Sequence, residues 1–194
     1  RLLNGKETWC IAWSEPGAGS DLSSVSCSAV DDGDSYRLNG CKTWSSGAHA
    51  ARWALVLART DVKRKGPEGL SCLVADMRDE GVRVVPTRKL TGDSDFCTLY
   101  FDDVKIPKNQ LIGVPGGGWA IVTHAAAQER LIVGAAPSLL QELRELVHLA
   151  NDSFFNGRPA IEDSEIRQKL AQLEIEGAML RCTTLRFLSG LTRG

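Results

Sequence analysis

Hydrophobic residues in the first half of the chain gather in short runs that are separated by turn-forming residues. Runs of strand length bounded by Asp, Gly and Pro are typical of β-strands. Such runs are Trp53–Ala58, Leu70–Val74, Val82–Val85 and Thr98–Phe101, and the turns include Asp31-Asp32-Gly33 and Lys65-Gly66-Pro67. Regularly spaced short strands predict an antiparallel sandwich or barrel.

The Asn39-Gly40 pair stands between two further strand-like segments, Ser35–Leu38 and Cys41–Trp44. Both residue types tolerate the positive φ that a type I′ turn requires at its two central positions. The pattern therefore predicts a two-residue β-hairpin, with the segment Lys42–Gly47 on its second arm.

After Gly113 the spacing of apolar residues becomes helical. The segment Trp119–Ala150 is rich in Ala, Leu, Glu and Arg. Pro137 is expected to kink or divide this helix, because proline removes a backbone donor and clashes with the preceding turn.

A second helix is predicted from Asp163 to about Leu188, and Asp163 or Ser164 has the side-chain oxygen needed to cap it. Its apolar stripe, at alternating spacings of four and three, consists of Ile166, Leu170, Leu173, Gly177 and Leu180. The sequence thus predicts an α+β chain. An antiparallel β-barrel or sandwich middle domain over residues 1–112 is followed by part of an α-helical bundle over residues 113–194.

Composition and charge exclude several classes of function. The 194 residues carry 23 basic and 24 acidic side chains, so the formal net charge is −1. A chain this neutral lacks the basic surface that nucleic acid or an anionic membrane attracts. No apolar run approaches the roughly 20 residues of a membrane span, and Arg1–Cys10 lacks the pattern of a secretory signal. We expect neither a nucleic-acid partner nor a membrane partner.

Cysteine and histidine spacings give no sign of a metal site. The six cysteines form no CxxC pair, and the three histidines form no HxxxH or HExxH pattern. Zinc sites need such spacings, so we expect no metal. In an acidic chain without a signal sequence, the cysteines are expected to be reduced thiols.

The segment Trp13–Asp21 combines glycines, which let a ligand approach the backbone, with the hydroxyls of Ser14 and Ser20. It contains neither GxGxxG nor GxxxxGKS/T, so a Rossmann or P-loop phosphate site is not predicted. Taken alone, such a cluster of Gly, Pro and Ser is more often a plain turn.

The segment Lys42–Gly47 places Trp44 beside Ser45 and Ser46. A flat apolar face with neighbouring hydroxyls suits a planar heteroaromatic ring with polar edges. The alternative is that Trp44 belongs to the core of the sheet, and composition alone favours that alternative.

Glu129 precedes Arg130 within the first predicted helix. The positions three and four residues away from Glu129 are all apolar: Ala125, Ala126, Ile132 and Val133. A carboxylate buried there without a partner would have a raised pKa, as a general base often has. The alternative is that Glu129 points to solvent or pairs with a distant cation.

Four segments, taken together, resemble the acyl-CoA dehydrogenases. They follow one another in the same order and at similar spacings as in that family, from about Cys10 to Arg130, with a looser match to the end of the chain. They are WSEPGAGSDL, LNGCKTWSSGAHAARWALVLARTD, TLYFDDVKIP and GGGWAIVTHAAAQERL. One such segment would be weak support, whereas four in register are strong support.

The resemblance implies an enzyme of lipid metabolism that holds FAD non-covalently and dehydrogenates an acyl-CoA thioester. In that family a base removes the α-proton while the β-hydrogen passes to flavin N5 as hydride, and the protein supplies orientation, hydrogen bonds and the base. The implied cofactor-binding residues are Ile11, Trp13, Ser14, Gly19, Ser20, Trp44, Ser45 and Ser46.

Individual roles follow from the same resemblance. Ser14 stands where the family usually has a Thr that hydrogen-bonds the isoalloxazine edge, and serine keeps the hydroxyl. Ser20 matches a position near the pyrophosphate and the substrate. In the second segment Trp44 would pack against the flavin ring, and a hydroxyl of Ser45 or Ser46 would reach its polar edge.

Glu129 is the catalytic base that the resemblance implies. Most family members place the catalytic Glu in a later helix, but a minority, including long-chain and isovaleryl-type enzymes, use a Glu immediately before an Arg in the first long helix. Arg130 would then bind substrate at the thioester and CoA end of the site. The small side chains of Ala126 and Ala127 favour a bulky or long acyl group.

The stretch Asp152–Pro159 departs from the family, because it lacks the Arg and Gln that usually touch FAD across a subunit interface. Residues Arg158–Ala171 instead resemble a bacterial branch that handles unusual acyl-CoAs and includes mixed oligomers. The implied partners are an electron-transferring flavoprotein and further subunits of a homo- or hetero-oligomer, either a dimer or a tetramer. The implied location is the bacterial cytoplasm, or the mitochondrial matrix in a eukaryote.

Two alternatives stay open at this point. One is an oxygen-using relative, either an acyl-CoA oxidase or a flavin monooxygenase of the same fold. The other is a non-catalytic partner subunit of a heteromeric dehydrogenase. Because family subunits are much longer, we expect these residues to comprise two incomplete domains that do not turn over substrate alone.

Overall fold

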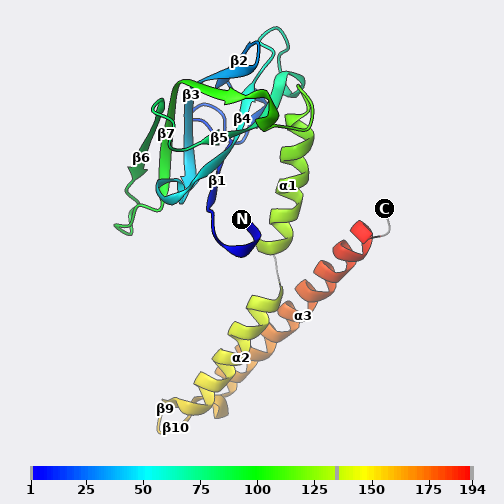
Figure 1. Ribbon diagram of the computed structural model, residues 1–194. Helices are drawn as coiled ribbons and strands as arrows, with labels where there is room; N and C mark the ends of the chain where they lie inside the picture. The colour runs from blue at the N-terminus through cyan, green and yellow to red at the C-terminus, as the bar shows by residue number, and fades with distance from the viewer. Residues whose placement is uncertain (1, 134–135, 193–194) are drawn as a thin grey trace. The chain divides into compact units, whose positions relative to one another are not determined.

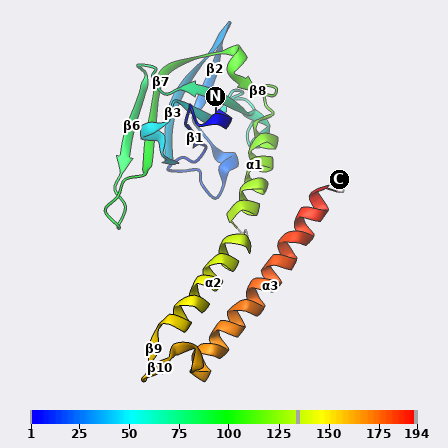
Figure 2. The same ribbon diagram turned by 60° about the horizontal axis from the view of Figure 1, so that its bottom comes forward.

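The computed structural model describes residues 2–133 and 136–192 (Figures 1 and 2). The chain divides into two compact units, Arg1–His124 and Ala125–Gly194. The first unit is built on a β-sheet and the second consists mostly of helix, which confirms the predicted α+β class. The domain limits 1–112 and 113–194 stay a prediction.

One sheet makes up most of the first unit. Its strand order is β6-β7-β3-β2-β4-β5-β8, and β1 pairs with β4 beside this path. Most neighbouring strands are antiparallel, but β1 runs parallel to β4, and β2 meets β4 in a parallel pair. The strands are β1 (Trp9–Ala12), β2 (Ser28–Asp32), β3 (Ser35–Ser46), β4 (Trp53–Arg59), β5 (Leu70–Asp76), β6 (Val82–Thr87), β7 (Phe96–Pro107) and β8 (Leu111–Ile112).

This topology corrects the purely antiparallel pairing of the predicted barrel or sandwich, because the sheet is mixed. The end strands β6 and β8 are not paired with each other in the described residues, so a closed barrel is not shown. The parallel pair was missed because β1 is short and its partner β4 comes much later in the chain. Fully buried leucines of the central strands form the core of the sheet: Leu38, Leu57, Leu73 and Leu99.

The hairpin predicted at Asn39-Gly40 is wrong, because β3 runs without a turn from Ser35 to Ser46. Gly40 has φ +142° and lies at a shift in the β3–β7 register, so the pair forms a β-bulge. A Cβ on Gly40 would lie 2.8 Å from the Cα atom of Cys27. The Asn39 side chain accepts a hydrogen bond from the Asp103 amide at 2.8 Å and closes the bulge on β7.

The turns predicted at Gly33 and Gly66 are confirmed. Gly33 has φ +72° between β2 and β3, and Gly66 has φ +74° between β4 and β5. Short 3-10 helices occupy other connections, at Leu2–Asn4, Leu22–Ser24, Ala48–Ala50, Pro67–Gly69, Lys108–Gln110 and Ala160–Glu162.

The described residues after the sheet form three α-helical elements: α1 (Gly118–Val133), α2 (Ala136–Asp152) and α3 (Ser164–Thr192). Pro137 lies in the first turn of α2. Residues 134–135, just before it, lie outside the described residues, so the kink or division expected at this proline stays a prediction. Within the second unit α2 and α3 lie side by side, joined through a short hairpin of β9 (Phe154–Phe155) and β10 (Arg158–Pro159) (Figure 2).

The cap and the stripe predicted for α3 explain this packing. The Asp163 carboxylate accepts hydrogen bonds from the amides of Glu165 and Ile166, at 3.0 and 3.1 Å. Gly177 is buried, and a Cβ there would lie 3.0 Å from a methyl carbon of Leu143 on α2. The small residue in the stripe therefore lets the two helices approach closely.

Candidate functional site

A loop segment (Trp13–Asp21) and the end of strand β3 (Lys42–Ser46), far apart in sequence, are joined by their backbones. The Thr43 amide donates a hydrogen bond of 2.9 Å to the Ser14 carbonyl. Because β1 ends at Ala12 beside β4, the chain that follows it passes along β3 at this point. The structure thereby brings together the two segments that the sequence singled out separately.

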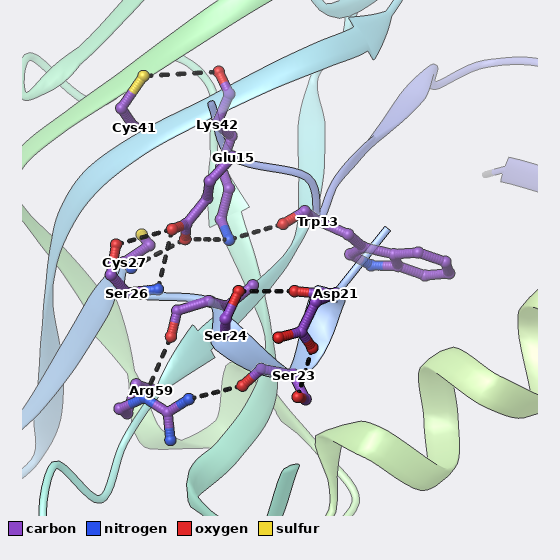
Figure 3. A network of polar contacts seen from close by, with 11 residues as sticks. Trp13, Glu15, Asp21, Ser23, Ser24, Ser26, Cys27, Cys41, Lys42 and Arg59 are labelled. Atoms are coloured by element: carbon purple, nitrogen blue, oxygen red, sulfur yellow. Dashed lines mark hydrogen bonds and ion pairs between the residues drawn. The ribbon is translucent and has the colours of Figure 1, made fainter. Parts of the chain in front are cut away.

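A buried ion pair fixes the same junction (Figure 3). The Lys42 ammonium donates to Glu15 Oε1 and to the Trp13 carbonyl, both at 2.8 Å. The side chains of Lys42 and Glu15 are only 0% and 6% exposed. The Lys42 side chain therefore leaves β3 toward the protein interior and ends inside the first loop segment.

The Glu15 carboxylate accepts three more hydrogen bonds. Ser26 donates to Oε2 from both its amide and its hydroxyl, and the Cys27 amide donates to Oε1, each at 2.8 Å. Three N–H donors and one hydroxyl that converge on one carboxyl group favour its ionised form. Burial alone would raise the pKa of Glu15, but Lys42 and the two amides hold that pKa below its ordinary value. Burial holds the pKa of the Lys42 ammonium below its ordinary value.

The loop beyond Glu15 is held at its far end by Arg59. The guanidinium of Arg59 donates to the carbonyls of Ser23 and Val25, at 3.0 and 3.1 Å (Figure 3). Between these anchors Gly17, Gly19 and Ser20 are exposed. A Cβ on Gly17 or Gly19 would meet no atom within 4 Å, so packing inside this chain does not require glycine at either position.

Trp44 lies outside the core of the sheet. Its side chain is 61% exposed, and its ring meets the Phe96 ring edge-on at 5.8 Å between centroids. The residue has φ +59° at a second register shift of β3, between Lys42 and Ser45. A left-handed conformation is unfavourable for a bulky residue, and such conformations gather at functional sites. The core alternative for Trp44 does not hold.

The other predicted cofactor contacts divide into exposed and buried residues. Ile11 is 49% exposed, Ser46 is also exposed, and Ser14 is half-buried. Ser45 is fully buried, and its hydroxyl has no hydrogen-bond partner among the described residues. The Trp13 indole N–H is likewise buried without a described partner. Of the two adjacent serines, Ser46 is therefore the one with an accessible hydroxyl.

Glu129 lies on α1 within the second unit, and its side chain is exposed. The solvent-facing alternative agrees with this placement, and the role of Glu129 as a base stays a prediction. The side chain of Arg130 lies outside the described side chains, so its predicted contact with substrate also stays a prediction.

The described cysteines form no disulfide with one another. Burial raises the pKa of Cys10 and of Cys72 to about 11, and that of Cys27 to about 12. These thiols are protonated at neutral pH and unreactive as nucleophiles.

The described residues contain no group of three or more His, Cys, Asp or Glu side chains arranged to hold a metal ion. No helix in the described part of the chain has the length and apolarity needed to cross a membrane.

Sequence reasoning missed Lys42 and Glu15 as a pair. Both residues stand inside the segments that were singled out, yet no local spacing links residues so far apart. The available signal was a lysine in the middle of a strand-like segment, because a lysine that is buried in a sheet is almost always paired.

Two family descriptions match this chain. "Acyl-CoA dehydrogenase, middle domain" matches residues 10–104, and "Acyl-CoA dehydrogenase, C-terminal domain" matches residues 116–194. Acyl-CoA dehydrogenase IpdE1 of Mycobacterium tuberculosis is 37% identical over 174 residues, which are 89% of this chain and 44% of that protein. The chain therefore spans less than half the length of this relative.

Solved structures agree with the sequence matches. The ChsE4-ChsE5 complex from Mycobacterium tuberculosis superposes with a TM-score of 0.86 at 28% identity, covering 99% of this chain and 50% of that chain. The Tcur3481-Tcur3483 steroid ACAD superposes with a TM-score of 0.84 at 28% identity, covering 95% of this chain and 47% of that chain.

Proposed function

This chain belongs to the acyl-CoA dehydrogenase family, and we propose from that premise that its intact protein removes hydrogen from the α and β carbons of an acyl-CoA thioester with FAD as cofactor. Bound FAD would supply the redox chemistry by accepting the β-hydrogen as hydride. The protein would bind and orient both molecules and would take the α-proton.

The observation that carries this proposal is the contact between the Trp13–Asp21 loop and the end of strand β3. An exposed indole face at Trp44 and an accessible hydroxyl at Ser46 lie on the strand that is hydrogen-bonded to the Ser14 backbone. These groups fit a planar heteroaromatic ring with polar edges. Ser14 and Ile11 would complete the contacts on the first segment, while the contact that the resemblance implies for Trp13 stays a prediction, because its indole N–H is buried.

The open space at Gly19 supports the same assignment. Gly19 has neither a positive φ nor a packing neighbour within 4 Å of an added Cβ. Glycine at such a position is explained by a ligand that approaches the backbone. Ser20, exposed beside it, would hold the pyrophosphate and would lie next to the substrate. The buried hydroxyl of Ser45 would contribute to the packing of β3 and not to the cofactor.

Glu129 would act as the base that removes the α-proton of the thioester, and Arg130 would shape the CoA end of the substrate site. A carboxylate accepts this proton, and the carbanion character that develops needs an electron acceptor beside it. The small Ala126 and Ala127, together with similarity to a solved steroid ACAD, favour a bulky acyl group as substrate.

Further subunits and an electron-transferring flavoprotein are the proposed partners. The similarity to the ChsE4-ChsE5 complex and the missing Arg and Gln in Asp152–Pro159 favour a heteromer. The location in the bacterial cytoplasm stays a prediction, in keeping with mycobacterial relatives.

The proposal is tested by titrating the intact, flavin-free protein with FAD and following the quenching of flavin fluorescence. We expect saturable binding, either by the protein alone or by its complex with a co-expressed family subunit. Binding only in the complex would favour the heteromer. A folded protein that binds no FAD alone or in the complex would support the non-catalytic alternative instead.

A further inference from the structure

The Lys42–Glu15 pair differs from the other ion pairs of the described residues in its burial. Its side chains are 0% and 6% exposed. The next most buried pair, Arg52–Asp76, has side chains that are 24% and 37% exposed. Removing two charges from water is unfavourable, and a buried ion pair often contributes no more stability than apolar residues of the same volume. Stability alone therefore does not account for this pair.

Its contacts show what the pair does to the backbone. Lys42 donates to the Trp13 carbonyl, and the next residue, Thr43, donates its amide to the Ser14 carbonyl. Two consecutive residues of β3 thus hold two consecutive carbonyls of the first loop segment. The position of Ser14 relative to Trp44 is fixed by these bonds.

The carboxylate of the pair extends the same restraint to the end of the loop. The Glu15 carboxylate accepts hydrogen bonds from the amides of Ser26 and Cys27, just before β2 begins. A backbone bridge between Glu15 and Ala18 closes the loop on itself. As Figure 3 shows, Lys42 and Glu15 therefore sit at the centre of contacts from three segments of the chain.

We propose that Lys42 and Glu15 are positioning residues, which hold the Ser14–Ser20 loop against β3 so that its hydroxyls and open glycines face the flavin. This inference rests on the proposed function. Neither side chain touches the cofactor, because both are buried beneath the loop. The pair fixes the backbone conformation of the loop before the ligand binds. Less conformational entropy is then lost on binding.

The test compares Lys42→Met with the matched control Arg52→Met in the intact protein. The control breaks the Arg52–Asp76 ion pair of the same unit. The readouts are the Kd for FAD, the melting temperature, and hydrogen exchange at the backbone amides of residues 14–20 other than Pro16. A double variant, Glu15→Gln with Lys42→Met, removes both charges. It replaces the single variant in the test if the single variant folds poorly.

We expect the Kd for FAD to rise about tenfold or more in the Lys42 variants. Exchange at residues 14–20 should accelerate with it, because the loop loses its restraint. The control should keep the wild-type Kd even where its melting temperature falls. A folded double variant with wild-type Kd and wild-type exchange would overturn the inference.

The two readouts separate this inference from the proposed function. A wild-type protein that binds no FAD would overturn the proposed function, and with it the cofactor part of this inference. Faster exchange at residues 14–20 in the same Lys42 variants would still support the restraint of the loop. If the wild type binds FAD but exchange at these residues is the same in the Lys42 variants as in wild type, the restraint alone would be overturned.

Discussion

The Glu15 carboxylate shows how a single buried charge organises its surroundings. It accepts hydrogen bonds from Ser26, Cys27 and Lys42, so its ionised form has a partner on every side. The sequence places Glu15 in a loop that is rich in Gly, Pro and Ser, which by local rules is a turn exposed to solvent. Tertiary contacts from β3 and from the start of β2 override that rule.

Replacing Glu15 with glutamine is expected to destabilise the protein. The variant leaves the Lys42 ammonium buried without its counter-charge, and loss of one partner of a buried pair lowers the free energy of unfolding by about 3–5 kcal/mol. Urea denaturation of the intact protein measures this change. A loss below about 1 kcal/mol would contradict the structural account of the pair, because an exposed pair contributes no more than that.

The same carboxylate predicts how stability depends on pH. The pKa of Glu15 in the folded protein lies below its ordinary value of 4.5. Its contribution is therefore present above pH 4.5 and is lost as the pH falls below that value. The difference in unfolding free energy between wild type and Glu15→Gln should shrink on going from about pH 7 to about pH 3. If this difference stays constant over the range, the contacts with Lys42 and the amides do not lower the pKa of Glu15.

Gly19 provides a test at a residue that packing does not constrain. Gly19→Ala should leave the free energy of unfolding within about 0.5 kcal/mol of wild type, since the added methyl group meets no atom within 4 Å. It should weaken FAD binding, because the methyl group would occupy the space proposed for the ligand. FAD titration and urea denaturation measure the two effects. Unchanged affinity would remove Gly19 from the proposed site.

Glu129 is tested by Glu129→Gln in the intact protein, with Glu142→Gln on α2 as the control. Both glutamates are exposed on helices of the second unit. If Glu129 is the base, its loss should lower the rate of acyl-CoA dehydrogenation by about 100-fold or more while FAD stays bound. The control should keep wild-type turnover. Near-normal turnover of Glu129→Gln would place the base elsewhere.

At the scale of elements, the sequence predicted strand segments within β3 to β7 and the two helical stretches in approximately their observed places. It failed at Asn39-Gly40, where local preference for a type I′ turn pointed to a hairpin. The outcome depends on β7, which pairs with β3 on both sides of this point and leaves no room for a turn. The parallel pairing of β1 with β4 was missed for a similar reason, since strand pairing between distant segments leaves no local signal.

The bulge gives a prediction at this scale. Gly40→Ala combines φ +142° with a Cβ that would lie 2.8 Å from the Cα atom of Cys27. Gly33→Ala is the matched control, because Gly33 has φ +72° and no neighbour within 4 Å. The control should lose about 1–2 kcal/mol of unfolding free energy, and Gly40→Ala should lose clearly more. Equal losses in urea denaturation would show that the contact with Cys27 is not decisive.

At the scale of the whole molecule, the proposed cofactor contacts lie in the first unit and the proposed base lies in the second. The resemblance in sequence suggested both sets of residues from four short segments, and their roles stay predictions. It did not reveal that Ser45 is buried and Trp44 exposed. Nor did it reveal that a buried ion pair connects the Trp13–Asp21 loop to strand β3. Those features arise from the register of β3 against its neighbours, which depends on the whole sheet.

The most direct test of the proposed function follows the visible absorbance of the flavin in the intact FAD-bound protein. The protein is mixed without oxygen with a series of acyl-CoAs, from butyryl-CoA to a CoA thioester with a steroid side chain. The account predicts that at least one thioester bleaches the flavin in wild type and that Glu129→Gln abolishes rapid bleaching. A flavin that stays oxidised with every thioester would contradict the proposed dehydrogenation of acyl-CoA thioesters.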